Sequence, residues 1–232
     1  MGQLGLPLRL PAAGALDRFV VAGNLEAFAA LRHWLGGDGE PCLFLHGEAH
    51  SGKTHLLQGA ADDLARRGRG VLYLPLGHAA LTPAVLADLE RLDGVIIDAL
   101  EAIAGEPAWE RGLFDLYNRL REAGRRLLAA ARQPPAQLAL RLPDLRSRLG
   151  AGPVYGLRPL DDSGRAELLR RAADDRGLPL EQPAIDYILA RCRRDPGWLC
   201  RFVERLDAAS LAARRAPTVR FIASLLERSA LD

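Results

Sequence analysis

The eight residues Gly47–Thr54, GEAHSGKT, constrain the fold more than any other part of the sequence. They fit the pattern GxxxxGK[ST], follow the apolar run Pro41–His46, and precede a helical pattern that reaches Leu64. A strand, a glycine-containing loop and a helix in this order are typical of a phosphate-binding P-loop. The glycines let the backbone curl until its N–H groups converge on phosphate oxygens, and the start of the helix adds positive potential. The loop therefore predicts a nucleotide site.

Lysine usage supports this prediction, because all but one of the 31 basic residues are arginine and the single lysine is Lys53. In a P-loop this lysine reaches the β- and γ-phosphates, and the hydroxyl of the next residue, Thr54, binds Mg²⁺. The alternative is an ordinary glycine-containing turn before a helix. The predicted nucleotide-binding residues of the loop are Gly47, Glu48, Ala49, His50, Ser51, Gly52, Lys53, Thr54 and His55.

A second acidic element is expected at the end of a neighbouring strand, and the run Gly94–Asp98 provides it. We expect Asp98 to hold Mg²⁺, or a water bound to it, together with Thr54. An aspartate in this place can also simply cap the turn that follows the strand. Hydrolysing P-loop proteins of this class usually carry a second acid at the next position, where this chain has Ala99, and Glu101 is expected to point elsewhere. The pattern predicts nucleotide binding without efficient hydrolysis.

Two domains and an arm follow from the pattern of apolar residues. Short apolar runs alternate with amphipathic segments, which predicts an α/β domain at residues 17–160 built on a buried parallel sheet. Beyond Pro159 the strand-like runs cease, Asp161–Ser163 can cap a helix, and helical spacing predicts a small all-α domain of three or four helices at residues 161–232. Glycine and proline make residues 1–16 an extended arm. The expected strands are 41–46, 71–76, 95–97, 127–131 and 154–160.

Composition excludes several classes of protein. The 232 residues are 49% hydrophobic and 26% charged, as in ordinary globular proteins, and no apolar run is long enough for a membrane span. We expect a cytoplasmic protein without membrane partners, because the N-terminus also lacks the features of a secretory signal. The net charge of +2 argues against binding DNA through a strong overall field, so DNA contact is expected to be indirect.

Several longer segments resemble one family. They are GEAHSGKTHLLQGAADDLARRG, GVIIDALEAIAGEPAWERGLFDLYNRLREAG and RQPPAQLALRLPDLRSRLGAG. They resemble the AAA+ module of the bacterial replication initiator DnaA, and more closely the DnaA-related Hda regulators, from about Phe19 onward. The resemblance implies an AAA+ P-loop module with a parallel sheet flanked by helices, followed by a helical lid. It further implies bound ADP or ATP with Mg²⁺, and base contacts from Phe19 and Val20.

The ends of the sequence refine the comparison with this family. An initiator continues past its lid into a DNA-reading domain, whereas this sequence stops at Asp232, so we expect no sequence-specific reader. Residues 3–8, QLGLPL, resemble the hexapeptide that docks Hda on the sliding clamp of the replicative polymerase. In such a peptide the glutamine amide hydrogen-bonds at one end of a groove and leucines fill an apolar pocket at the other. The predicted clamp-binding residues are Gln3, Leu4, Leu6, Pro7 and Leu8.

The resemblance also assigns a role to Arg148 in the stretch SRL. In related AAA+ assemblies this arginine projects into the nucleotide pocket of the next subunit, although Arg146 or an ordinary surface arginine are alternatives here. Two positions depart from the family: Arg132 occupies the place of the γ-phosphate sensor, and Gly197 that of the lid arginine, with Arg194 and Arg201 nearby. Together with Ala99, these departures favour a site that holds nucleotide to set the conformation of the protein.

The resemblance implies a regulator that stimulates ATP hydrolysis by DnaA while docked on the DNA-loaded clamp, and so inactivates the initiator. Its partners would be DnaA, the clamp, DNA through the clamp, and a second copy of itself in a homo-oligomer. Two alternatives stay open. One is an autonomous P-loop enzyme such as a kinase or NTPase, and the other is a helicase-loading AAA+ adaptor.

Overall fold

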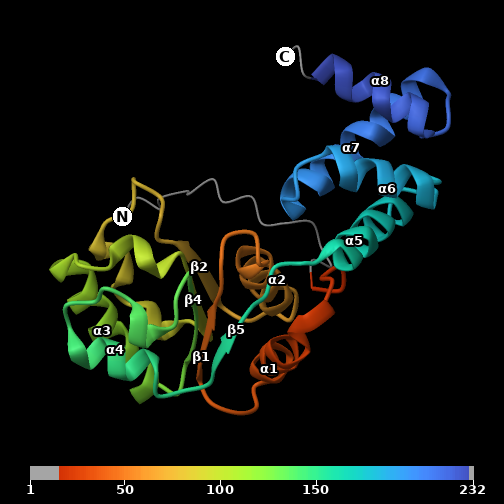
Figure 1. Ribbon diagram of the computed structural model, residues 1–232. Coiled ribbons are helices and arrows are strands. Elements are labelled where there is room, and N and C mark those ends of the chain that lie inside the picture. Colours follow the sequence, from red (N-terminus) through yellow and green to blue (C-terminus); the bar gives the residue numbers. More distant parts are fainter. Residues whose placement is uncertain (1–15, 230–232) are drawn as a thin grey trace. The chain divides into compact units, whose positions relative to one another are not determined.

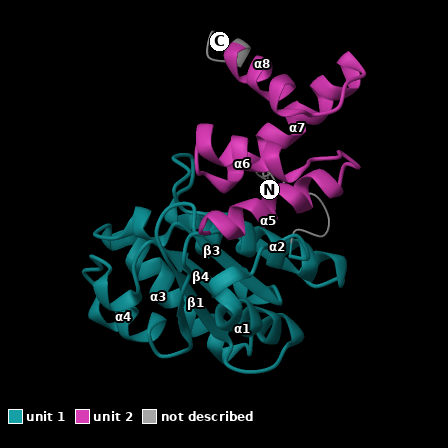
Figure 2. Cartoon of the chain, turned by 45° about the vertical axis from the view of Figure 1, so that its right-hand side comes forward, with its two compact units in different colours: residues 1–159 teal, residues 160–232 magenta. Residues whose placement is uncertain are grey.

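A computed structural model describes residues 16–229 of the chain. The chain divides into two compact units, residues 1–159 and 160–232, which Figure 2 shows in different colours. The first unit combines helices with one sheet, and the second is helical. Within the described residues no helix is both long enough and apolar enough to cross a membrane.

The sheet of the first unit has five strands in the order β2-β3-β4-β1-β5, and every neighbouring pair is parallel. Because the strands are parallel, their carboxyl ends share one edge of the sheet, and the loops after β1, β3 and β4 meet there. The strands are β1 (Cys42–His46), β2 (Val71–Pro75), β3 (Gly94–Asp98), β4 (Arg126–Ala131) and β5 (Val154–Gly156).

Helices cover both faces of this sheet (Figure 1). Phe44 of β1 packs in a core with the inner sides of α3 and α4, whereas its neighbours Leu43 and Leu45 pack in a second core with α1 and α2. Alternate residues of the buried strands thus supply the two cores, as expected for a sheet covered on both faces. The helices are α1 (Leu25–Gly36), α2 (Lys53–Arg66), α3 (Pro107–Glu122) and α4 (Pro143–Leu149).

Short 3₁₀ turns complete the connections of this unit. The turn η4 (Leu100–Ile103) begins directly after β3, where Ala99 has the left-handed φ of 57°. The other turns are η1 (Ala22–Asn24), η2 (Pro83–Leu86), η3 (Leu89–Arg91) and η5 (Pro135–Gln137).

The α/β fold and the parallel sheet confirm the sequence prediction, but one strand is shorter than expected. The expected strand at 154–160 pairs only over Val154–Gly156. Leu157 still donates its N–H to the His46 carbonyl at 2.6 Å, after which Pro159 offers no N–H to continue the ladder. The segment beyond Gly156 therefore leaves the sheet.

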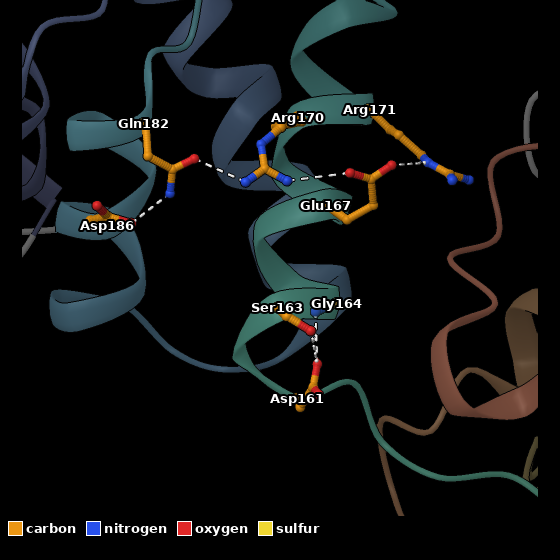
Figure 3. Close-up of polar contacts among 8 residues, drawn as sticks. All are labelled: Asp161, Ser163, Gly164, Glu167, Arg170, Arg171, Gln182 and Asp186. Carbon is orange, nitrogen blue, oxygen red and sulfur yellow. Dashed lines mark hydrogen bonds and ion pairs between the residues drawn. The ribbon is translucent and has the colours of Figure 1, made fainter.

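The second unit consists of α5 (Asp162–Asp174), α6 (Gln182–Arg191), α7 (Pro196–Ala213) and α8 (Val219–Ser229). Asp161 caps α5, as its sequence context predicts, by accepting hydrogen bonds from the Gly164 N–H and the Ser163 hydroxyl, both at 2.8 Å (Figure 3). Arg170 of α5 donates to the Gln182 side chain at 2.9 Å and so joins α5 to α6. Phe202 is buried in the core of the unit, and the partly buried Trp198 stacks on it with ring centroids 5.1 Å apart.

Candidate nucleotide-binding site

The predicted phosphate loop leads from β1 into α2, as the sequence indicates. The Gly47 N–H donates to the Ala131 carbonyl at 3.3 Å, which ties the start of the loop to the end of β4. A Cβ on Gly47 would lie only 2.4 Å from the Leu157 carbonyl oxygen, and a Cβ on Gly52 would lie 2.9 Å from the Phe19 ring. Gly52, which caps α2, also has a left-handed φ of 93°. Both positions therefore require glycine, and the loop has the narrow backbone turn of a phosphate cradle.

Lys53 lies across this loop. Its ammonium donates to the carbonyls of Gly47 at 2.7 Å and Glu48 at 2.8 Å. Burial lowers the pKa of Lys53, and its charge also faces Glu101, Asp98 and Arg132, of which the two carboxylates oppose the shift. A half-buried ammonium at the start of a helix fits a phosphate group, because the phosphate adds a counter-charge that the loop carbonyls cannot supply.

Thr54 and Asp98 lie together at the carboxyl edge of the sheet, as predicted for a magnesium site. The Thr54 hydroxyl donates to Asp98 Oδ2 at 2.7 Å, and the Tyr73 hydroxyl donates to the same oxygen at 2.8 Å. The other oxygen of this buried carboxylate accepts the Ala99 N–H at 2.9 Å. A hydroxyl and a carboxylate at this separation are ligand types that suit Mg²⁺, so these residues fit the ion.

The expectation that the Glu101 side chain points away from the site is wrong, because the side chain contacts Arg132. Its Oε1 lies 3.2 Å from Nε of Arg132, and its Oε2 accepts the Arg132 N–H at 3.2 Å. Arg132 directly follows Ala131, the residue bonded to Gly47, so the Glu101–Arg132 pair lies beside the phosphate loop. The cause is local, because the left-handed Ala99 and the turn η4 return the chain toward β4. Strand order could have revealed this residue, since β3 lies next to β4.

Phe19 and Val20 are buried, and Phe19 forms part of the core beneath the loop. The Phe19 ring stacks on Phe28 at 5.5 Å between centroids and on His55 at 6.0 Å. The structure thus brings Phe19 and His55 together next to Gly52. Base contact by Phe19 and Val20 stays a prediction.

Arg148 lies at the opposite end of the sheet. It borders a cavity of about 320 Å³ together with Cys42, the first residue of β1, whereas the phosphate loop follows the last residue of that strand. Among the described residues, none forms a hydrogen bond or ion pair with the Arg148 guanidinium. Arg146, two residues earlier, donates to the Leu140 carbonyl. The two arginines of this helix therefore differ, since Arg146 is bonded within the unit and Arg148 is not.

The remaining predicted residues lie elsewhere. Gln3, Leu4, Leu6, Pro7 and Leu8 are outside the described residues. Gly197 lies in the first turn of α7, where Asp195 accepts its N–H at 2.8 Å. Arg194 lies 3.5 Å from the Asp162 carboxylate within the second unit.

Comparisons with known proteins identify the lid domain and the fold. Residues 162–226 match the model of the Hda lid domain. The chain is similar to AMPPCP-bound DnaA from Aquifex aeolicus, with a TM-score of 0.72 and 22% identity over 85% of this chain and 66% of that one. It is also similar to domain III of DnaA from Thermotoga maritima, with a TM-score of 0.78 and 20% identity over 95% of this chain and 98% of that one.

The RuvB Holliday junction branch migration motor of Thermotoga maritima aligns with a TM-score of 0.69 and 20% identity over 94% of this chain and 72% of that one. These likenesses establish the fold. The chain spans about 66% of the Aquifex initiator chain, so the activity of that whole protein does not transfer with the fold. Residues 162–226 thus form an Hda-like lid domain, and the part of the chain with the phosphate loop and the parallel sheet shares the fold of the DnaA structures.

Proposed function

We propose that this chain stimulates ATP hydrolysis by DnaA in trans while docked on the DNA-loaded sliding clamp, and that it thereby inactivates the initiator. The observation that carries this proposal is the position of Arg148. Its guanidinium has no bonding partner among the described residues and lies at the amino edge of the sheet, while the chain's own phosphate loop lies at the carboxyl edge. An arginine so placed is suited to a nucleotide held by another molecule.

The chain's own site would hold ADP or ATP with Mg²⁺. Lys53 and the amides of the loop would bind the phosphates, Thr54 and Asp98 would hold the ion, and Mg²⁺ would neutralise phosphate charge. No acid follows Asp98 directly, and Glu101 is bonded to Arg132. Hydrolysis at this site should therefore be slow, and the nucleotide would serve to fix the conformation of the protein.

The contribution of Arg148 would be electrostatic. In hydrolysis, negative charge spreads over the oxygens of the transferred phosphoryl group, and an arginine supplied by a partner stabilises that charge. In GTPases such an arginine is worth about 10³ to 10⁵ in rate. Lysine should substitute poorly, because it lacks the planar fork that contacts two oxygens together.

Docking on the clamp would raise the local concentration of the regulator near DNA-bound initiator. The residues that support it are Gln3, Leu4 and Leu6 of the arm, whose sequence suits an extended peptide in a groove. Changing all three to alanine should abolish retention of the clamp in a pull-down while nucleotide affinity stays unchanged. Retention by the altered arm would reject this part of the proposal.

The central experiment mixes the chain with clamp on DNA and ATP-loaded DnaA, and measures phosphate release. Arg148→Ala should remove the stimulation, on the order of 10³-fold, and should leave thermal stability unchanged because the guanidinium has no bond to lose among the described residues.

Arg146→Ala is the matched control, and its effects should be the reverse. It should lower the free energy of unfolding by about 1 kcal/mol, since it removes the bond to the Leu140 carbonyl, and it should keep the stimulation. Equal effects of the two substitutions would place the catalytic arginine elsewhere. Turnover by the isolated chain at about 1 s⁻¹ or faster would favour an autonomous enzyme.

A further inference from the structure

The cavity next to Arg148 is lined by more positively charged than negatively charged residues. It has a volume of about 320 Å³ and lies between α3, α4 and the amino ends of β1 and β4. Three arginines line it, and Glu40 is the single acidic residue among its described lining residues. The lining includes Glu40, Cys42, Tyr117, Arg121, Arg125 and Arg148.

The three arginines differ in their bonds. Arg125 donates to Asp93 at 2.9 Å, although its Nε is buried and has no hydrogen-bond partner among the described residues. The guanidinium groups of Arg121 and Arg148 form no hydrogen bond or ion pair with any residue that the structure describes. Their charges are directed at the same place, since both act on the Tyr117 hydroxyl and oppose the rise in its pKa that burial causes.

The other titratable groups of the cavity do not cancel this charge. Burial raises the pKa of the Cys42 thiol to about 12, so the thiol is neutral at physiological pH. Asp93 pairs with Arg125, and the single charge of Glu40 can offset only one of the other two guanidinium charges. At least one guanidinium charge therefore lacks a counter-ion within the described residues, and a concave surface with excess positive charge attracts an oxyanion.

Arg121 and Arg148 reach the same cavity from two different helices. It lies in the last turn of α3, four residues after Tyr117, so the two side chains share one face of the helix. Arg148 approaches the same cavity from the last turn of α4. Two guanidinium groups on separate helices can approach one phosphate group from two sides, whereas a single planar fork approaches it from one side only.

We propose that this cavity receives the terminal phosphate of the partner's nucleoside triphosphate, and that Arg121 contacts that phosphate beside Arg148. The inference rests on the proposed function and adds a second residue to it. Water attacks the γ-phosphorus as the bond to the bridging oxygen breaks, and ADP leaves with that electron pair. The products are ADP, hydrogen phosphate and one proton released to solvent. Arg121 and Arg148 stay protonated throughout and stabilise the charge on the phosphoryl oxygens.

The test compares Arg121→Ala, Arg121→Lys and Arg111→Ala in the phosphate-release assay with clamp on DNA and ATP-loaded DnaA. Arg111 is the matched control, because it is an exposed arginine of the same helix that lies outside the cavity and also has no ion-pair partner among the described residues. We expect Arg121→Ala to lower the maximal stimulated rate about 10²-fold, the usual cost of losing one donor to a transition-state oxygen. Arg121→Lys should recover part of that rate, and Arg111→Ala should match the unaltered chain.

The concentration dependence separates phosphate contact from docking. An unchanged maximal rate in the Arg121→Ala variant would overturn the inference and leave the proposed function intact. This holds whether or not the half-saturating concentration rises. Stimulation that is absent even with the unaltered chain would overturn both. Loss of the maximal rate at an unchanged half-saturating concentration is the outcome that supports a phosphate contact.

Discussion

The two edges of the sheet hold positive charge in different ways. At the carboxyl edge, Lys53 is bonded to the carbonyls of its own loop and Arg132 to Glu101. At the amino edge, Arg121 and Arg148 border an open cavity without such bonds among the described residues. A cation that serves the chain's own ligand can be held in place by its own chain. The proposed function accounts for the difference, because a cation meant for another molecule's nucleotide has to remain available.

The two edges should also differ in how they bind a phosphate group. A phosphate that binds at the carboxyl edge must replace the bonds that Lys53 makes with Gly47 and Glu48, so part of its interaction is an exchange. A phosphate at the amino edge would replace only water around Arg121 and Arg148. The amino edge should therefore respond more strongly to salt, because its charges are less shielded by the protein.

At the carboxyl edge, the largest effect is expected from Lys53→Ala, which removes the ammonium of the phosphate loop and leaves the amino edge unchanged. The affinity for ADP should fall about 10²-fold, as expected for the loss of a charge-assisted contact to phosphate. The rise in melting temperature in saturating ADP should shrink with it, through linkage. Binding of a fluorescent ADP analogue and thermal unfolding with and without ADP would measure both. An unchanged affinity would mean that the loop is not the nucleotide site.

A smaller effect is expected when the Glu101–Arg132 pair is altered. The ratio of the dissociation constants for ATP and ADP should change about 3- to 10-fold, in opposite directions for substitutions of the two residues. Glu101→Gln should release Arg132 and remove a negative charge beside the loop, which favours ATP over ADP. Arg132→Ala should leave the Glu101 carboxylate without its partner, which disfavours the more highly charged nucleotide. The ratio of the two dissociation constants, measured by calorimetry on the isolated chain, gives the result. Shifts in the same direction would show that the pair does not sense the terminal phosphate.

The smallest effect concerns His46, the last residue of β1. Burial lowers its pKa in the folded chain, and the Lys53 charge lowers it further. The unfolded chain thus binds a proton at a pH where the folded chain does not, and stability should fall as the pH drops through the unfolded value near 6.5. Chemical denaturation between pH 5 and 8 would reveal this slope, and His46→Gln should flatten it. A slope that persists in the variant would assign it to other groups.

The sequence predicted the features of the carboxyl edge that depend on local pattern. The phosphate loop, the strand before it and the acid at the end of β3 each occupy a continuous stretch, so spacing alone located them. The expected direction of the Glu101 side chain is wrong, because that direction depends on the left-handed backbone at Ala99 and on the position of β3 next to β4. Neither the backbone angle nor the strand order is encoded in hydrophobic periodicity.

The amino edge was less predictable for a related reason. Sequence similarity singled out Arg148, but the cavity depends on α3, α4 and two strand ends that lie far apart along the chain. The difference between Arg146 and Arg148 likewise arises from the Leu140 carbonyl, which only the folded chain brings to one of them. In the second unit, by contrast, the helix cap at Asp161 followed directly from local sequence.

The close approach of Gly47 to Leu157 has a practical consequence for dissecting the protein. Leu157 bonds to His46 through its N–H, and its carbonyl fills the space that a side chain at position 47 would need. One wall of the phosphate loop is therefore supplied by a residue only two positions before Pro159, the last residue of the first unit. A shortened polypeptide meant to bind nucleotide must extend beyond Leu157, since a cut at the end of β5 would keep every strand and still remove that wall.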